Sequence, residues 1–273
     1  MEANNSKKRV GKKSRGISAA LVILCCAVIA VCLFFFVFGD PANFVNGDRS
    51  NHPIQGNPLG IVYKGGPVIC IIITLLLTVL TLSVERIFAI GKAKGKGNLI
   101  NFVYDVKQRL ENGDIKGAEA LCNKQKGSVA SIISAGLKKY EDMEVTTEDL
   151  SKEQKLMSIQ KTIEEATALE LPSMEQNLPV IAAISTLGTL FGLLGTVIGM
   201  IRAFSALATE GAPDALALST GISEALVNTA LGIATGASAI ISYSYFTGKI
   251  DNMTYAIDEM GFSIVQTYAA KHR

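Results

Sequence analysis

The residues of this chain that could do chemistry in apolar surroundings lie between residues 178 and 245. Two long apolar segments fill this range; the first carries Thr196 and Arg202, and the second carries Glu224 and Thr229. An isolated charge at the centre of a bilayer costs about 2.5 to 3.5 kcal/mol even on the gentler scales. We therefore expect Arg202 and Glu224 to face each other, a partner molecule or water. The threonine hydroxyls do not titrate near neutral pH, so they can form hydrogen bonds but cannot carry charge.

The spacing of these residues places them in pairs. The turn between the two segments has its centre near Ala212, and Thr196 lies sixteen residues before it while Thr229 lies seventeen after it. In an antiparallel helical hairpin the two threonines then share one depth, because every helical residue advances the chain by the same rise. The same count places Arg202 level with Glu224. We expect a polar lining to which both helices contribute.

Small residues also recur at four-residue spacing along both segments. Such stripes let two helix backbones approach closely in a membrane, where burial of apolar surface no longer drives association. The pattern predicts a tightly bundled or oligomerising helix pair. The glycines that we assign to helix packing are Gly188, Gly192, Gly195, Gly199, Gly232 and Gly236.

The composition narrows the class of protein. Apolar residues make up 49% of the sequence and charged residues 18%, and there is no tryptophan. This balance is typical of a polytopic membrane protein with a modest soluble part. The formal net charge of +2 is too small to indicate a nucleic-acid partner. We expect an all-α fold with four transmembrane helices and a cytoplasmic helical domain, in contact with membrane lipid.

The distribution of basic residues predicts the topology. Lysines and arginines precede the first apolar segment and follow the second, so we expect both termini in the cytoplasm. A cleavable signal peptide is the alternative for the first segment, but the apolar core of such a peptide usually has only about 7 to 15 residues. The expected order is a cytoplasmic basic arm (1–18), a transmembrane helix (19–38), a periplasmic loop (39–66), a transmembrane helix (67–91), the cytoplasmic helical domain (92–176), a pore helix (177–208), a periplasmic turn (209–214), a second pore helix (215–246) and a cytoplasmic C-terminal helix (247–273).

The helical domain should contain three short amphipathic helices followed by a long one. Pro172 and Pro179 interrupt the long helix close to the first pore helix, and they either kink it or separate the two helices. Glu85 and Arg86 end the second apolar segment. We interpret them as side chains that snorkel to the membrane surface, with a functional pair as the alternative.

Two segments carry a family resemblance. GLLGTVIGMIRAF (192–204) and GISEALVNTALGI (221–233) resemble the two pore-helix signatures of the bacterial MotA/TolQ/ExbB proton-channel proteins, most closely the ExbB/TolQ branch. Weaker similarity covers residues 67–173. The chain departs from the family pattern at Ser238, where a proline is common. By resemblance, Thr196 and Thr229 match the paired pore threonines and Glu224 matches the glutamate that precedes the second of them.

We assign five residues to the predicted pore and proton pathway, and two interpretations stay open for some of them. Glu224 forms a structural bridge to Arg202, or it organises protons and water in the lumen. Each threonine lines the pore, or it only packs helices through a hydrogen bond to its own backbone. The five residues are Thr196, Thr229, Glu224, Asn228 and Arg202.

The resemblance also implies partners and a function. Copies of the chain are expected to assemble, by analogy as a pentamer, around an ExbD/TolR-like single-span protein whose membrane aspartate binds and releases protons. Proton passage in the inner membrane would then energise TonB-dependent transport across the outer membrane through a TonB-like protein. A TolQ-like role in envelope maintenance and a stator of a gliding or flagellar motor are alternatives. A non-conducting four-span scaffold is an alternative of another class.

Soluble catalysis finds no support in the sequence, which lacks a nucleotide-binding glycine loop, an HExxH motif and a plausible triad. We therefore do not expect an enzyme, a cofactor or a metal. The outer loop offers Asp40, Asp48 and His52, whose spacing matches no set of metal ligands. The cysteines fit small apolar residues better than disulfides or a zinc site; they are Cys25, Cys26, Cys32, Cys70 and Cys122.

Overall fold

The computed structural model describes residues 18–146, 150–208 and 215–272. Most of the basic arm and the whole predicted turn 209–214 lie outside these ranges. Within them the chain is helical and forms no β-strand. The helices are α1 (Ala19–Cys32), which continues as a π-helix (Leu33–Phe38), α2 (Pro58–Lys64), α3 (Pro67–Lys94), α4 (Leu99–Glu111), α5 (Ile115–Gln125), α6 (Gly127–Val145), α7 (Lys152–Glu175), α8 (Leu178–Ala208) and α9 (Ala215–Lys271).

Four helical stretches are long and apolar enough to cross a membrane. They lie in α1 with its continuation, in α3, in α8 and in the first half of α9. In α1 and its π-helical continuation the side chains of Leu24, Val28 and Phe36 are exposed, which suits a helix in contact with lipid. The predicted all-α class with four membrane-spanning helices is confirmed.

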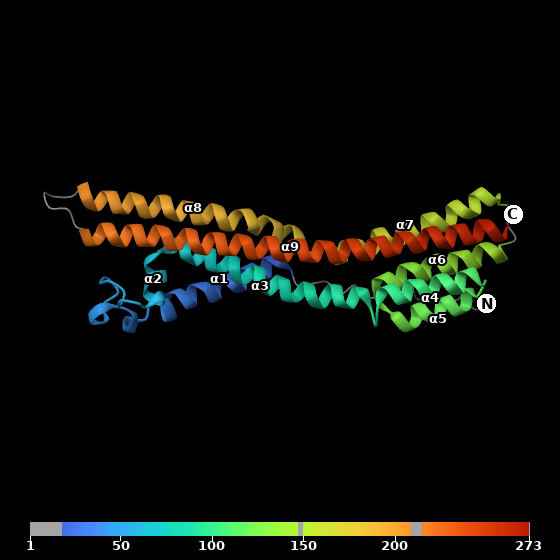
Figure 1. The fold of residues 1–273 in the computed structure, drawn as a ribbon, viewed down its shortest axis with the longest axis horizontal. Coiled ribbons are helices and arrows are strands. Elements are labelled where there is room, and N and C mark those ends of the chain that lie inside the picture. Colours follow the sequence, from blue (N-terminus) through green and yellow to red (C-terminus); the bar gives the residue numbers. More distant parts are fainter. Residues whose placement is uncertain (1–17, 147–149, 209–214, 273) are drawn as a thin grey trace, which may run out of the picture.

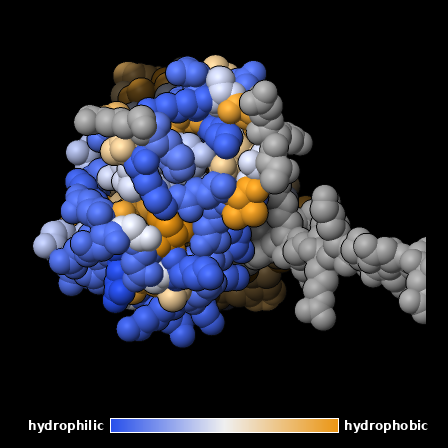
Figure 2. Space-filling model, turned by 90° about the vertical axis from the view of Figure 1, so that its right-hand side faces the viewer, coloured by the Kyte–Doolittle hydropathy of each residue, from blue (hydrophilic) through white to orange (hydrophobic). Residues whose placement is uncertain are grey.

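The molecule is long and narrow because α9 runs along its whole length (Figure 1). At one end α9 pairs with α8, and α1 and α3 lie beside this hairpin. At the other end α9 packs against α4, α6 and α7. We call the second part the bundle, defined as α4 to α7 with the C-terminal half of α9. Figure 2 views the molecule from the bundle end and shows a largely hydrophilic surface, as expected for a part that lies in water.

The glycine stripes hold α8 against α9 within one chain. A Cβ atom added to Gly232 would lie 2.6 Å from the Cα of Gly192, and one added to Gly199 would lie 2.9 Å from the Cβ of Ala225. Side chains at these positions would separate the helices, so only glycine permits this approach. Gly188 and Gly236 meet in the same interface, where a Cβ on Gly188 would lie 3.1 Å from the Gly236 nitrogen.

One continuous helix replaces the two that we expected at the C-terminus. We expected a pore helix (215–246) and a separate C-terminal helix (247–273), but α9 spans both without a break. The composition becomes polar after Tyr245, yet no proline follows, so the backbone has no reason to end the helix there. Its second half packs against the bundle through the buried side chains of Ile250, Met253, Ile257, Met260 and Ile264.

Three helices of the bundle, α4, α5 and α7, begin at side-chain caps. The Asn98 carboxamide oxygen accepts a hydrogen bond from the Ile100 amide at the start of α4. Asp114 lies between α4 and α5, and its carboxylate accepts a hydrogen bond from the Gly117 backbone amide at the start of α5. That bond holds the pKa of the Asp114 carboxyl below its ordinary value. Ser151 begins α7 with a capping box.

The junction of α7 and α8 corrects our interpretation of Glu85 and Arg86. Arg86 does not snorkel, because its side chain is only 1% exposed and forms a two-bond ion pair with Glu85. Its guanidinium also donates to the carbonyl oxygen of Met174 at 3.0 Å. The last carbonyls of a helix lack partners in their own helix and attract positive charge, which explains why the arginine turns inward.

α7 and α8 are two separate helices and do not form one kinked helix. Pro172 lies inside α7, and α7 then ends at Glu175. Asn177 adopts a φ of 67°, in the left-handed region, and α8 begins at the next residue. The side-chain amide nitrogen of Asn177 donates to a carboxylate oxygen of Glu85 at 3.3 Å. The same buried ion pair therefore holds the break between the two helices.

The loop 39–66 packs against the ends of the apolar helices. Asn43 is buried, and its amide donates to the carbonyl oxygens of Val37 and Phe38 at the end of the π-helix. His52 lies 3.2 Å from the Thr220 hydroxyl of α9. These contacts place the loop over the same end of the molecule as the start of α9.

Candidate proton-pathway site in the α8–α9 hairpin

Two threonines from facing helices form the centre of the candidate site. Thr196 lies on α8 and Thr229 on α9, and their hydroxyl oxygens are in hydrogen-bond contact. The Thr196 hydroxyl also lies 3.3 Å from the Gly192 carbonyl oxygen and 3.4 Å from that of Ala225. The Thr229 hydroxyl lies 3.3 Å from the same Gly192 oxygen. The equal depth predicted from the residue count is therefore confirmed.

This pair can hold a proton-carrying group but cannot ionise itself. A hydroxyl has one hydrogen to donate and two lone pairs. Both Thr196 and Thr229 are half-buried, so lone pairs remain for water or for an acid from another molecule. The Thr196 hydroxyl also donates to the carbonyl oxygen of Gly192, four residues earlier on the same helix. This is the bond that we expected if the threonine only packs helices. The same hydroxyl thus serves helix packing and the threonine pair.

The predicted charge pair lies nearer the loop 39–66. Arg202 and Glu224 form an ion pair with 3.3 Å between nitrogen and oxygen, in which Arg202 is 52% exposed and Glu224 only 12%. With Lys64 of α2 they line a cavity of about 520 Å³. Burial lowers the pKa of the Lys64 ammonium, and the nearby Glu224 carboxylate partly offsets this shift. The half-buried Glu224 therefore faces two cations.

The α8–α9 hairpin, which holds both pairs, lies within a region that matches a known protein family. A sequence model of the MotA/TolQ/ExbB proton channel family matches residues 124–259, about half of the chain. The chain belongs to the MotA/TolQ/ExbB proton channel family. The match begins in α5 and ends in α9, so it contains all five predicted site residues. Our sequence analysis extended the resemblance further, to residue 67.

The chain is similar both to proteins named as ExbB relatives and to proteins named TolQ. An ExbB homologue of Methanothermobacter thermautotrophicus is 35% identical over 94 residues, which is 34% of this chain and 33% of that protein. An ExbB-like biopolymer transport protein of Synechocystis is 32% identical over 112 residues, 40% of this chain and 53% of that protein. The Tol-Pal system protein TolQ of Haemophilus influenzae is 27% identical over 135 residues, 49% of this chain and 59% of that protein.

The chain thus spans from a third to somewhat over half the length of these relatives. The four apolar helices and the family match together make it a multi-pass membrane protein. The family is one of proton channels and transport proteins and is not a class of enzymes.

The structure separates Asn228 from the threonine pair. Its side chain is 2% exposed and fills the space beside Gly195, where an added Cβ would lie 2.4 Å from the Asn228 Cβ. The Asn228 amide nitrogen donates to the Gly65 carbonyl oxygen at 3.1 Å. Its amide oxygen has no hydrogen-bond partner among the described residues. Asn228 therefore joins α9 to the turn between α2 and α3.

Two residues of this region were not singled out by sequence. Lys64 lines the cavity beside Glu224, and Gly65 accepts the bond from Asn228. The run Lys64 to Pro67 carries two glycines before a proline, which predicts a tight turn. A turn signal does not tell which helix the turn touches, and that contact depends on the packing of α3 against α9.

Proposed function

We propose that this chain is an ExbB-like subunit of a proton-channel motor in the bacterial inner membrane. With an ExbD/TolR-like single-span partner it uses the proton gradient to energise TonB-dependent transport across the outer membrane. The observation that carries the proposal is the contact between the Thr196 and Thr229 hydroxyls inside the region that the family model covers. ExbB relatives support the choice of branch.

The titrating group in this proposal belongs to the partner. Several copies of the chain, a pentamer by analogy, enclose the partner helix, and its carboxylate binds and releases protons beside the threonine pairs. A charged carboxylate is costly in apolar surroundings and a protonated one is far less so. Each proton therefore changes the preferred position of the partner helix. The continuous α9 supports transmission of this movement from the hairpin to the bundle.

The proposed orientation places both termini and the bundle in the cytoplasm. Lys92, Lys94 and Lys96 follow the apolar part of α3 on the bundle side, as the positive-inside rule requires. The loop 39–66 then lies in the periplasm, together with the turn between α8 and α9. Arg202, Glu224 and Lys64 would form the periplasmic end of the pathway.

Proton flux into liposomes tests this function. The full-length chain, reconstituted with its single-span partner, should conduct protons. Thr229→Val should reduce the flux at least about tenfold, because the isosteric valine removes the hydroxyl that contacts Thr196 and that would hold water or the acid of the partner. Thr235→Val is the matched control, since the hydrogen bond of the Thr235 hydroxyl within the described ranges is to the Leu231 carbonyl oxygen of its own helix. Full flux in Thr229→Val would count against the pore role. Absence of flux in the unmutated complex would favour the non-conducting scaffold.

A TolQ-like role in envelope maintenance is the second candidate. It is favoured by the TolQ relative of Haemophilus influenzae, whose alignment covers the largest share of this chain among the three relatives described. Expression of the chain in strains that lack ExbB or TolQ separates the two roles. Restored TonB-dependent uptake supports the ExbB-like function, and restored detergent resistance supports the TolQ-like function.

A further inference from the structure

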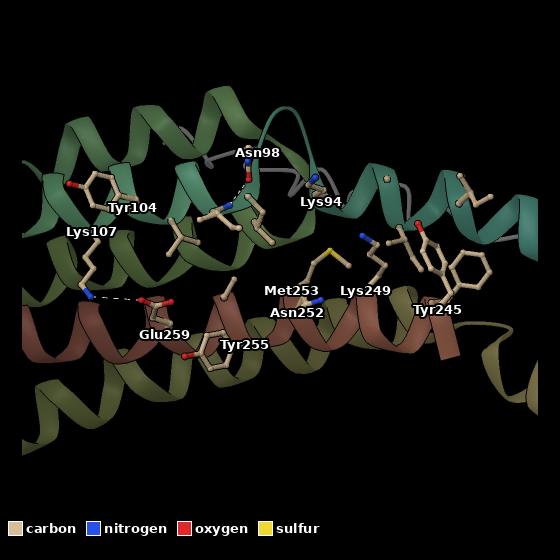
Figure 3. Close-up of a pocket in the computed structure, with 18 of the residues that line it drawn as sticks. Lys94, Asn98, Tyr104, Lys107, Tyr245, Lys249, Asn252, Met253, Tyr255 and Glu259 are labelled. Carbon is tan, nitrogen blue, oxygen red and sulfur yellow. Dashed lines mark hydrogen bonds and ion pairs between the residues drawn. The ribbon is translucent and has the colours of Figure 1, made fainter. Parts of the chain in front are cut away.

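A groove outside the hairpin runs along the start of the bundle. It has a volume of about 1100 Å³ and lies between α3 and α4 on one side and α9 on the other. Figure 3 shows its lining side chains converging from these elements. None of the five predicted pathway residues lines it.

The lining of the groove is apolar at one end and charged at the other. At the end nearest the apolar helices the wall consists of Ile87, Ile90 and Tyr245, and both Ile87 and Tyr245 are 57% exposed. At the opposite end Lys107 and Glu259 form an ion pair at 3.8 Å, and Glu111 also lines the groove. Figure 3 shows this pair at the end of the groove away from Tyr245.

Two lysines lie between these ends. Lys94 comes from the last turn of α3 and Lys249 from α9. Neither lysine forms an ion pair with another described residue, and the Lys249 ammonium lies 5.5 Å from the centroid of the Tyr245 ring. The middle of the groove therefore carries positive charge that the described part of the chain does not neutralise.

The groove lies at the boundary of the membrane. In α3 the buried pair Glu85 and Arg86 is followed by a short apolar stretch that ends just before Lys92, and the apolar part of α9 ends near Tyr245. Aromatic residues such as tyrosine favour this depth, and lysines reach from it to lipid headgroups. Acyl chains consequently lie at the level of Ile87, and headgroup phosphates lie at the level of Lys94 and Lys249.

We propose that this groove binds an anionic phospholipid. The headgroup phosphate contacts Lys94 and Lys249, and one acyl chain lies along Ile87, Ile90 and Tyr245. Charge complementarity and depth favour a lipid over a second copy of the chain, because an acidic lipid supplies a negative group and an apolar chain in this order. Basic groups beside membrane helices are suited to anionic headgroups. The site is independent of the proposed proton pathway.

Lipid binding to the purified full-length chain in detergent tests the proposal by native mass spectrometry. The unmutated chain should bind phosphatidylglycerol more tightly than phosphatidylcholine, and inorganic phosphate at the same concentration should not compete. Lys94→Gln with Lys249→Gln should weaken phosphatidylglycerol binding by about five-fold for each lysine removed. Lys92→Gln with Lys96→Gln is the matched control, since these lysines flank Lys94 but do not line the groove. An equal loss in the control would overturn the proposal.

A second variant fills the groove without removing charge. Gly91 lines the groove, and a Cβ added there would meet no atom within 4 Å. Gly91→Leu should therefore keep the melting temperature of the chain while it displaces phosphatidylglycerol. Three outcomes contradict the proposal: unchanged lipid binding in Gly91→Leu, equal affinity of the unmutated chain for both lipids, and displacement by inorganic phosphate. A change in oligomer mass with unchanged lipid binding would assign the groove to a contact between copies.

Discussion

The guanidinium of Arg86 in α3 donates a hydrogen bond to the carbonyl oxygen of Met174 at 3.0 Å, across the end of α7. This bond ties the second apolar helix to the last turn of the bundle helix that precedes α8. The contact fixes where α7 stops and α8 begins, so it sets the position of the hairpin relative to the bundle.

Loss of Arg86 should destabilise the chain strongly. Arg86→Met leaves Glu85 as a mostly buried charge without its partner, and such a change costs about 3 to 5 kcal/mol. The double variant Glu85→Gln with Arg86→Met removes both charges and should be less destabilised than the single variant. Thermal unfolding of the purified chain in detergent measures both. Equal melting temperatures for the two variants would show that the buried charge is not the cause.

The approach of α8 and α9 should tolerate no side chain at Gly232. In Gly232→Ala the added Cβ would meet the Gly192 Cα and the Gly188 carbonyl oxygen, so overpacking should cost about 1 to 3 kcal/mol. Proton flux should fall with stability, because separation of the helices separates Thr196 from Thr229. Gly248→Ala on the same helix is the control. Its Cβ meets no atom within 4 Å, and alanine should gain up to about 1 kcal/mol there.

Reversal of the charge pair should separate the two roles of Glu224. Arg202→Glu and Glu224→Arg should each reduce proton flux, because each places two like charges about 3.3 Å apart. If the pair is a structural bridge, the double reversal restores most of the flux. If the Glu224 carboxylate itself carries or organises protons, the double reversal remains inactive although the chain folds. The flux assay in liposomes, with melting temperature as the control for folding, decides between them.

The stability of the folded chain should fall at alkaline pH because of the buried thiol of Cys122 in α5. Burial raises the pKa of this thiol to about 12, from an ordinary value of 9.0. Between these values the folded chain keeps the proton while the unfolded chain releases it. The free energy of unfolding should therefore decrease as pH rises above 9, by up to about 1.4 kcal/mol per pH unit.

Cys122→Ala removes this contribution, so the variant should lose less stability than the unmutated chain between pH 9.5 and 10.5. Denaturant unfolding of the full-length chain at both pH values measures the difference. Parallel pH dependences for Cys122→Ala and the unmutated chain would contradict the burial of this thiol.

Sequence alone was sufficient to place residues along their helices. Apolar length predicted four membrane-spanning helices, and a count from the turn predicted that Thr196 lies level with Thr229 and Arg202 level with Glu224. These predictions hold because a helix advances by a constant rise for each residue, so depth follows from counting alone. The glycine stripes were also visible, since they recur with the period of one helical face.

The tertiary structure decided which groups from distant parts of the chain meet. Arg86 was expected at the membrane surface but is buried, because the end of α7 offers it carbonyl oxygens that its own segment does not reveal. The Asn228 side chain likewise bonds to Gly65, which lies far away along the chain. The groove between α3, α4 and α9 likewise exists only where three segments pack together. Periodicity specifies the depth and face of a residue, whereas its partner depends on how separate helices pack.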